Sequence, residues 1–287
     1  MVRGTYTAAS GMAAQEHRFN AIANNLANAD THGYKRDLAV QKAFPQLLLR
    51  RMSDDGVLRV PYRDQGIGSV DKAPVIGVLG TGVEENEVFT VFEQGSLEQT
   101  ENSFDLALQG EGFFVVRTPG GERYTRNGSF LIGPEGLLVT KQGYPVLGEN
   151  GPIRIKLNNF VVDENGRIFE NDSFGDDPER LISVRENEWQ NTEEVDRLRI
   201  VDVRETRYLR KQGDSLWRST RESGDAETIY GDSRPKVRQG FLETANVNPV
   251  TEMVQMIEVN RAYEANQKVI QSQDDSTSRL INQALRI

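Results

Sequence analysis

The sequence contains no cysteine and only two histidines, His17 and His32, among its 287 residues. The absence of cysteine excludes disulfide bonds, thiolate catalysis and metal sites with thiolate ligands. Two histidines leave little material for an imidazole base or for a metal site that needs several imidazole ligands. These absences disfavour an enzymatic function before any motif is considered.

Long hydrophobic runs are also missing. No stretch approaches the ~20 apolar residues of a membrane-spanning helix, and the first seven residues, MVRGTYT, lack the apolar centre of a secretory signal. We therefore expect no stable membrane insertion, and a protein that is cytoplasmic or exported without a cleaved signal peptide. The formal net charge of −9, with both signs interspersed, argues weakly against nucleic acid as a partner.

Motifs that carry chemistry are scarce. Gly110–Gly112 lacks the third glycine and the Lys-Ser/Thr pair of a nucleotide-binding loop, so we interpret it as a tight turn that enters a buried strand. The acidic pairs Asp163-Glu164 and Asp176-Asp177 stand beside turn residues, which favours solvated loops over glycosidase carboxylates or calcium ligands. We expect no catalytic residue, no metal and no cofactor.

Both ends of the chain, in contrast, carry long helical periodicity. Over residues 5–28 the seam positions alternate at steps of four and three residues, which is a heptad pattern, and Gln15 is its one polar member. We predict a helix there, with Thr5 as its N-cap. Turn-forming residues at 28–33 should end this helix.

Residues 245–286 carry the periodicity of a second long helix, which is predicted to start at Pro249. Asn248 is a good N-cap and Pro249 stands at the favoured first helical position. Met256, Tyr263 and Ile270 repeat every seven residues, but the apolar stripe is narrow. Because an isolated helix of this kind is only marginally stable, packing against something else must supply most of its stability.

The middle of the chain has a different pattern. Residues 37–52 place several apolar residues on one helical face, although Pro45 opposes a helix, and residues 53–82 suggest an extended linker or arm. Over residues 83–243, turn signals recur about every 8–12 residues, as in an antiparallel sandwich or barrel. The predicted fold class is α+β, with long terminal helices and a central, mainly antiparallel β domain.

The apolar stripes of the two helices leave two interpretations open. The helices pack only on each other or on the β region within one molecule, or they form the seam of a coil between subunits. The second interpretation predicts a set of subunit-packing residues. These are Met12, Phe19, Ile22, Leu26, Met253, Met256, Ile257, Tyr263 and Ile270.

Several motifs resemble those of one known family. Residues 22–36, IANNLANADTHGYKR, resemble the N-terminal signature of bacterial flagellar basal-body rod and hook axial proteins, which usually have Phe at the position of Tyr34. Residues 240–249, GFLETANVNP, and residues 252–266 resemble its C-terminal signature. The resemblance covers most of the chain and is weakest over 165–235. The signature positions are Asn24, Asn25, Asn28, Gly33, Tyr34, Asn246, Asn248, Arg261 and Glu264.

The resemblance implies a structural subunit that polymerises helically into the flagellar rod in the periplasm and transmits torque from the motor to the hook. It implies that residues 1–36 and 243–287 form a coiled-coil inner domain that lines a tube. Residues 37–82 would form a short helix with an extended arm, and residues 83–242 an outer β domain.

The expected partners are copies of the chain, other flagellar rod proteins, the flagellar type III export apparatus, and hook and bushing-ring proteins. Within the family, Gly143–Gly148 is more similar to the proximal-rod type than to the distal-rod type. Hook-type axial proteins come third. A wall-acting periplasmic enzyme or an adhesin is the remote alternative.

Overall fold

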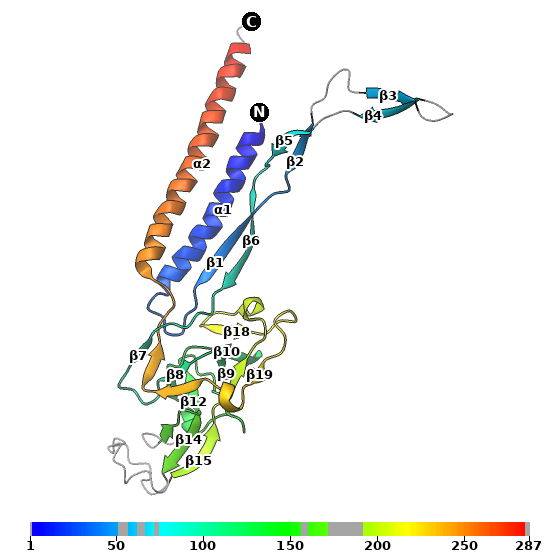
Figure 1. Ribbon diagram of the computed structural model, residues 1–287. Coiled ribbons are helices and arrows are strands. Elements are labelled where there is room, and N and C mark those ends of the chain that lie inside the picture. The colour runs from blue at the N-terminus through cyan, green and yellow to red at the C-terminus, as the bar shows by residue number, and fades with distance from the viewer. Residues whose placement is uncertain are drawn as a thin grey trace. The chain divides into compact units, whose positions relative to one another are not determined.

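A computed structural model describes residues 2–50, 57–61, 67–71, 75–155, 160–171 and 192–284. The fold is α+β, as predicted, with one long helix near each end of the chain and antiparallel strands between them (Figure 1). The chain divides into two compact units. The helical unit comprises Met1–Ala21, Ala39–Val88 and Val254–Ile287, and the β unit comprises Ile22–Leu38 and Phe89–Met253.

Helix α1 spans Val2–Ala27 and helix α2 spans Pro249–Ala284. Helix α2 begins as predicted, because the backbone N–H groups of Val250 and Thr251 donate to Asn248 Oδ1 at 3.0 and 3.4 Å. The predicted start of α1 is wrong. The helix already runs through the residues before Thr5, and the Thr5 hydroxyl donates to Gln273 Oε1 of α2 at 2.8 Å instead of capping a helix end.

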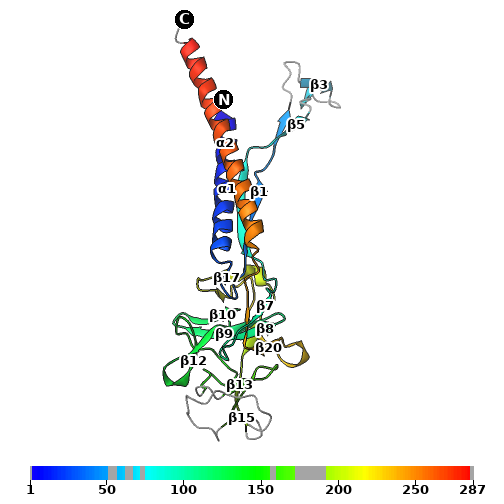
Figure 2. The same ribbon diagram turned by 90° about the vertical axis from the view of Figure 1, so that its left-hand side faces the viewer.

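Within the helical unit, α1 and α2 lie side by side (Figures 1 and 2). Two glycines of α1 face large amide side chains of α2. A Cβ atom on Gly4 would lie 2.1 Å from Gln273 Nε2, and one on Gly11 would lie 3.0 Å from Asn266 Nδ2. The missing side chain of glycine lets the helices approach here, so at these positions they meet through small and polar residues.

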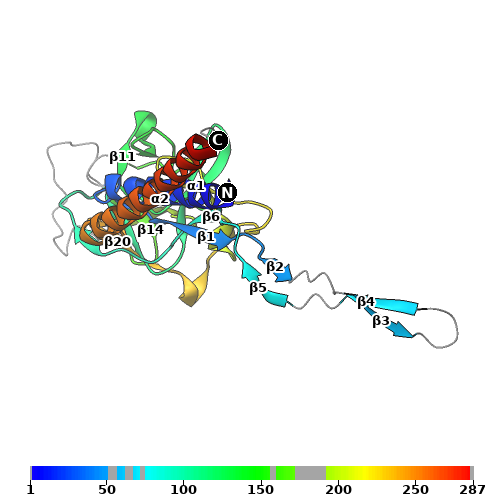
Figure 3. The ribbon, with the colours of Figure 1, turned by 90° about the horizontal axis from the view of Figure 1, so that it is seen from above.

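The helix predicted within residues 37–52 is wrong, because residues 37–43 and 47–50 form strands, and residues 51 and 52 lie outside the described residues. Three two-stranded pairs, β1–β6, β2–β5 and β3–β4, follow one another along residues 37–90, and Figure 3 shows the last two beyond the helices. Pro45 removes a helical hydrogen-bond donor, and the Phe44 N–H donates to the carbonyl of distant Gly82 at 3.0 Å. The bounds are β1 Asp37–Ala43, β2 Leu47–Arg50, β3 Val57–Pro61, β4 Ile67–Asp71, β5 Val75–Leu79 and β6 Val83–Thr90. The other residues of the predicted arm, 53–56, 62–66 and 72–74, lie outside the described residues.

The β unit is organised around a hairpin of β9 (Phe113–Thr118) and β10 (Gly121–Thr125), which confirms the buried strand predicted after Gly112. The hairpin lies inside a six-stranded sheet of order β17-β18-β10-β9-β16-β19. Alternate residues of β9 point to opposite faces. Phe114 belongs to one buried apolar cluster and Phe113 to another, which contains Trp217. Both faces of the sheet are therefore covered.

The remaining strands are short and pair antiparallel. Strands β20 and β21 pair with β8 and β7, so the chain just before α2 runs beside residues 97–109. The bounds are β7 Leu97–Gln99, β8 Leu106–Gln109, β11 Phe130–Ile132, β12 Leu138–Thr140, β13 Phe160–Val162, β14 Arg167–Asn171, β15 Thr192–Arg197, β16 Ile200–Asp202, β17 Arg210–Lys211, β18 Leu216–Arg218, β19 Glu227–Thr228, β20 Lys236–Gln239 and β21 Phe241–Glu243.

Candidate functional site

The turn that ends α1 is built from signature residues of the β unit. The Asn28 side-chain amide donates to both the carbonyl and the side-chain oxygen of Asn24 at 2.8 Å. Gly33 has φ +69°, its N–H donates to the Glu243 carbonyl at 2.7 Å, and a Cβ atom there would lie 2.4 Å from Asn127 N. Only glycine fits this backbone conformation and this close approach. The predicted end of the helix is confirmed.

Asn25 is the centre of a buried polar network. It is 2% exposed, and its side-chain oxygen accepts hydrogen bonds from the Tyr34 hydroxyl at 3.1 Å and from Asp37 N at 2.8 Å. Its amide nitrogen donates to the Asp37 carbonyl at 2.9 Å and to Glu252 Oε2 at 3.5 Å. One amide therefore joins the end of α1, the start of β1 and the first turn of α2. Burial, and secondarily the carboxylates of Asp37 and Glu252, raise the pKa of Tyr34.

Asn246 has a similar role in the segment before α2. Its side-chain oxygen accepts the Arg36 N–H at 2.7 Å, and its amide nitrogen donates to the carbonyls of Val91 and Glu93 at 2.8 and 3.2 Å. It therefore links the segment entering α2 to the segment leaving α1 and to the chain after β6. The signature asparagines Asn25 and Asn246 are bonded inside the β unit.

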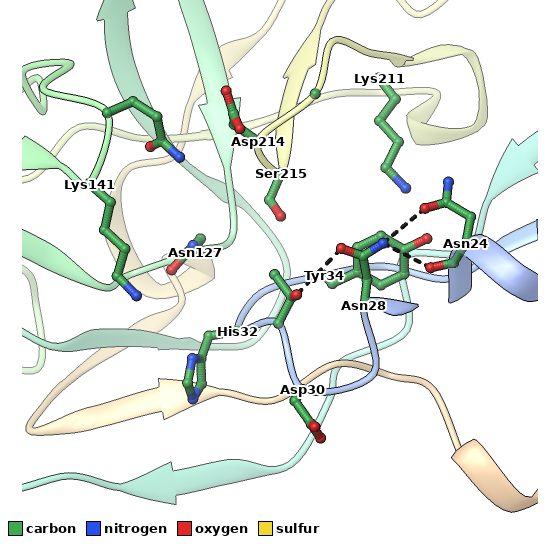
Figure 4. Close-up of a pocket in the computed structure, with 13 residues that line it drawn as sticks. Asn24, Asn28, Asp30, His32, Tyr34, Asn127, Lys141, Lys211, Asp214 and Ser215 are labelled. Atoms are coloured by element: carbon green, nitrogen blue, oxygen red, sulfur yellow. Dashed lines mark hydrogen bonds between the residues drawn. The ribbon is translucent and has the colours of Figure 1, made fainter. Parts of the chain in front are cut away.

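A polar cavity of about 780 Å³ lies beside the turn that ends α1 (Figure 4). Its wall includes His32 of that turn, together with Lys211 and Ser215 of the β17–β18 hairpin. The Lys211 ammonium group is already engaged, because it lies 2.9 Å from Asp37 Oδ2 and 4.1 Å from the centre of the Tyr34 ring. The wall carries both acidic and basic side chains, so it suits hydrogen-bonding groups better than an apolar ligand.

The predicted packing residues divide into three groups by exposure. Ile22 is buried, whereas Phe19, Met253 and Ile257 are 37%, 46% and 54% exposed. The remaining five, which are half-buried, are Met12, Leu26, Met256, Tyr263 and Ile270. Other exposed apolar residues of α2 are Val269, which flanks the heptad position Ile270, and Val250, Val254, Leu280 and Ile281, which the heptad pattern missed. The signature residues Arg261 and Glu264 are also exposed.

A smaller cavity of about 250 Å³ lies between the helices of the helical unit. Gln15, Phe19, Val259 and Tyr263 are among the residues that line it. The Gln15 side-chain oxygen is buried and has no hydrogen-bond partner. The one polar member of the predicted seam is thus an unsatisfied acceptor beside apolar and aromatic walls.

The described carboxylates of the predicted acidic loops, Asp163 and Glu164, are engaged in ion pairs. Asp163 lies 2.9 Å from Arg167, and Glu164 lies 2.8 Å from Lys236, in or beside the turn between β13 and β14. Asp176-Asp177 lies outside the described residues. His17 Nδ1 lies 3.0 Å from Glu85 of β6.

Sequence reasoning missed one set of residues, the buried charges Lys35, Arg126 and Glu243. The side chains of Lys35 and Glu243 are 0% exposed and their charged atoms are 2.6 Å apart. Burial lowers the pKa of Lys35, and Glu243 opposes that shift. The partners are 208 residues apart, so no local pattern could have joined them.

Among the described residues, no helix has the length and apolar character needed to cross a membrane. The fold also combines a β unit that has its own buried core with long helices that expose apolar side chains, and these features are typical of a subunit that assembles with others.

Comparison with known proteins identifies that class. Residues 6–35 match the family description "flagella basal body rod protein", and residues 238–283 match "flagellar basal body rod FlgEFG protein C-terminal". Residues 107–170 match the "flagellar hook protein FlgE/F/G D1 domain".

Relatives extend the match along the whole chain. The sequence is 33% identical over 284 residues to the flagellar basal-body rod protein FlgG of Buchnera aphidicola subsp. Schizaphis graminum, covering 98% of this chain and 99% of the relative. It is 32% identical over 291 residues to FlgF of Caulobacter vibrioides, covering 99% and 97%. It is 31% identical over 302 residues to the flagellar hook-basal body complex protein FlhO of Bacillus subtilis, covering 100% of both.

The chain therefore belongs to the flagellar basal-body rod protein family, and it is a structural axial subunit of the rod. This family is structural and is not a class of enzymes.

Proposed function

We propose that this subunit polymerises helically, through its terminal helices, into a rod that transmits torque from the motor to the hook. The observation that carries the proposal is the exposure of large apolar side chains on α2, among them Val254 and Ile257 at 51% and 54%. Such side chains gain stability when another subunit removes them from water. A contact between unlike surfaces, repeated by a rotation that does not close, generates an open helical tube.

In this proposal residues 1–36 and 243–287 form the coiled-coil inner layer. Residues 37–82 contact neighbouring subunits, and residues 83–242 face outward. The helices order fully only on docking, because their narrow apolar stripes are incomplete in one molecule. The half-buried seam residues Met256, Tyr263 and Ile270, with Met12 and Phe19 on α1, would then contact helices of other subunits.

The partners proposed are copies of this chain and other rod and hook proteins, with bushing-ring proteins at the outer surface. Export through the flagellar type III apparatus, without a cleaved signal, would place the rod in the periplasm. The remote alternative, a wall-acting enzyme or adhesin, gains no support from the family match.

We place the subunit in the proximal rod, because the Gly143–Gly148 segment is more similar to that type. The distal rod is the second candidate, and the similarity to relatives named FlgG supports it. Gold labelling of a tagged chain on isolated basal bodies separates the two positions. Label at the motor end supports the proximal position, and label confined to the hook end contradicts it.

The assembly proposal is tested by a charge on the exposed helix face. Ile257→Asp should abolish motility and rod completion in cells that lack their own copy, because a charge buried between subunits costs several kcal/mol. Gln267→Asp is the matched control, since Gln267 is an exposed polar residue of the same helix. Electron microscopy of basal bodies gives the measurement. Complete rods built from Ile257→Asp subunits would contradict the proposal.

A further inference from the structure

Three buried charges meet in the β unit at a single carboxylate. The side chains of Lys35 and Glu243 are 0% exposed, and that of Arg126 is 4% exposed. The triad contains two cations and one anion, so it is not neutral. Burying such charges is costly unless their geometry is well satisfied.

The two cations contact Glu243 in different ways. Lys35 Nζ donates to Glu243 Oε1 and to the Glu93 carbonyl, both at 2.6 Å, and Gly95 N donates to the same Oε1 at 2.9 Å. Arg126 Nε lies 3.8 Å from Glu243 Oε2, which has no hydrogen-bond partner. Lys35 is therefore hydrogen-bonded to the carboxylate, whereas Arg126 acts on it through charge alone.

The triad joins segments that are far apart in the sequence. Lys35 lies between α1 and β1, Arg126 follows β10, and Glu243 ends β21 shortly before α2. A main-chain hydrogen bond joins two of the same segments, because the Glu243 carbonyl accepts the Gly33 N–H at 2.7 Å. Position 243 is thus bound through its backbone and its side chain to the segment that leaves α1.

The strand that carries Glu243 is held by a very short ladder. Strand β21 pairs with β7 through three residue pairs, Phe241↔Gln99, Leu242↔Glu98 and Glu243↔Leu97. A shift by one residue would turn the Glu243 side chain to the opposite face and place the apolar Leu242 side chain toward Lys35. Main-chain hydrogen bonds from Thr100 N to the Gly240 carbonyl and from Thr244 N to the Ser96 carbonyl extend this ladder at both ends. Main-chain bonds of this kind can also form in a shifted register, whereas the buried triad can be satisfied in only one register.

A stability role alone does not explain the triad, because apolar residues of similar volume often stabilise a core as well as a buried ion group does. We infer that Glu243 is a positioning residue for rod assembly. Its carboxylate fixes the register of β21 against β7, and thereby the position at which the segment entering α2 meets Lys35 in the segment leaving α1. This inference rests on the proposed function only for its consequence in the rod, since the register can be measured in the isolated protein.

The register is tested by cross-linking, for which the absence of native cysteine gives a clean background. Gln99→Cys with Phe241→Cys reports the native register, and Glu98→Cys with Phe241→Cys reports a slip by one residue. In the otherwise unchanged chain only the native pair should form a disulfide, because the side chains of the second pair point to opposite faces. With Glu243→Gln added, cross-linking of the slipped pair should rise by about tenfold. A Glu243→Gln protein that cross-links only in the native register would overturn the inference.

Stability and assembly are then separated by a second set of variants. Glu243→Gln should lower Tm by roughly 10 °C, because it leaves two buried cations without an anion. The triple variant Lys35→Met, Arg126→Met and Glu243→Gln keeps an acceptor for Gly95 N and should recover most of that loss. The matched control is the exposed pair of Lys236 and Glu164, 2.8 Å apart. Lys236→Met with Glu164→Gln should change Tm by less than about 2 °C.

Incorporation into rods gives the last readout. The triple variant should remain at least about tenfold below the unchanged chain in basal bodies, because its register is no longer fixed. Incorporation equal to that of the unchanged chain would reduce the triad to a stability role and overturn the inference. If the unchanged chain itself is not incorporated, the proposed function fails, while the cross-linking result still decides the register.

Discussion

The β unit and the helical unit differ in how completely they bury their own large apolar side chains. In the β unit, Phe114 and Trp217 are 0% exposed, and the buried amide of Asn25 uses all of its hydrogen-bonding capacity. In the helical unit, Val254 and Ile257 are 51% and 54% exposed. A unit of the first kind can reach its final structure alone, whereas the second gains further stability from contact with another molecule.

The largest expected effect contrasts one phenylalanine in each unit. Phe114→Ala should destabilise the β unit by about 3–5 kcal/mol, because it opens a cavity beside Phe130, whose ring centre is 5.3 Å away. Phe19→Ala in α1 should cost less than about 1 kcal/mol in the isolated chain, since Phe19 is 37% exposed. Urea unfolding followed by far-ultraviolet circular dichroism measures both. Equal losses would remove the distinction between the units.

The turn that ends α1 gives the next largest effect. Gly33→Ala should cost roughly 2–4 kcal/mol, because the new Cβ atom would be forced against the backbone of Asn127 at a positive φ. Gly77→Ala is the matched control in the helical unit, since a Cβ atom there meets nothing within 4 Å. Thermal unfolding of both variants should show a clear loss for the first and almost none for the second.

The sequence predicts an element of the fold well where neighbouring residues determine it, and poorly where residues far along the chain do. The helices, the N-cap Asn248 and the turn at Gly33 follow from neighbouring residues, and the structure agrees with them. The strands at 37–50 were predicted as a helix because a short apolar run fits either structure. Their pairing depends on partners such as Gly82, which bonds Phe44 and lies too far along the chain for local patterns.

The same limit applies to the candidate site. The resemblance identified Asn25 and Asn246 as signature positions, but only the structure gives their hydrogen bonds. In the sequence, Lys35 and Glu243 look like ordinary solvated charges, because their neighbouring residues do not indicate that they are buried. Their roles depend on a contact between residues 208 positions apart, which an amino-acid pattern does not contain.

A smaller effect is expected from the Tyr34 hydroxyl in the Asn25 network, and it should depend on pH. Tyr34→Phe should cost about 1 kcal/mol near neutral pH, because it removes the hydrogen bond to Asn25. The pKa of Tyr34 is raised from 10.0 in the folded protein, so above pH 10 the unfolded chain loses this proton first. Tyr34 therefore lowers the stability of the folded protein as pH rises, by up to about 1.4 kcal/mol per pH unit.

The measurement is urea unfolding at several pH values between 9 and 11. The stability difference between the two proteins should shrink with rising pH, because the variant lacks the phenol. A difference that stays constant across this range would mean that Tyr34 ionises alike in both states.

The smallest effect has the opposite sign and belongs to the helical unit. Gln15→Met keeps the volume of the side chain but removes an acceptor that is buried without a partner, so the isolated chain should become more stable by up to about 1 kcal/mol. In a coil, however, a single polar residue in the seam can fix the register of the helices at a cost in stability. The same variant should then incorporate into rods less well than the unchanged chain.

Gln41→Met is the comparison, because the Gln41 amide already donates to the Ala14 carbonyl at 3.0 Å and its loss should only destabilise. If Gln15→Met leaves the stability of the isolated protein unchanged and assembles normally, the Gln15 side-chain oxygen already accepts a hydrogen bond from solvent. The comparison between the two units would then rest on their exposed apolar side chains alone.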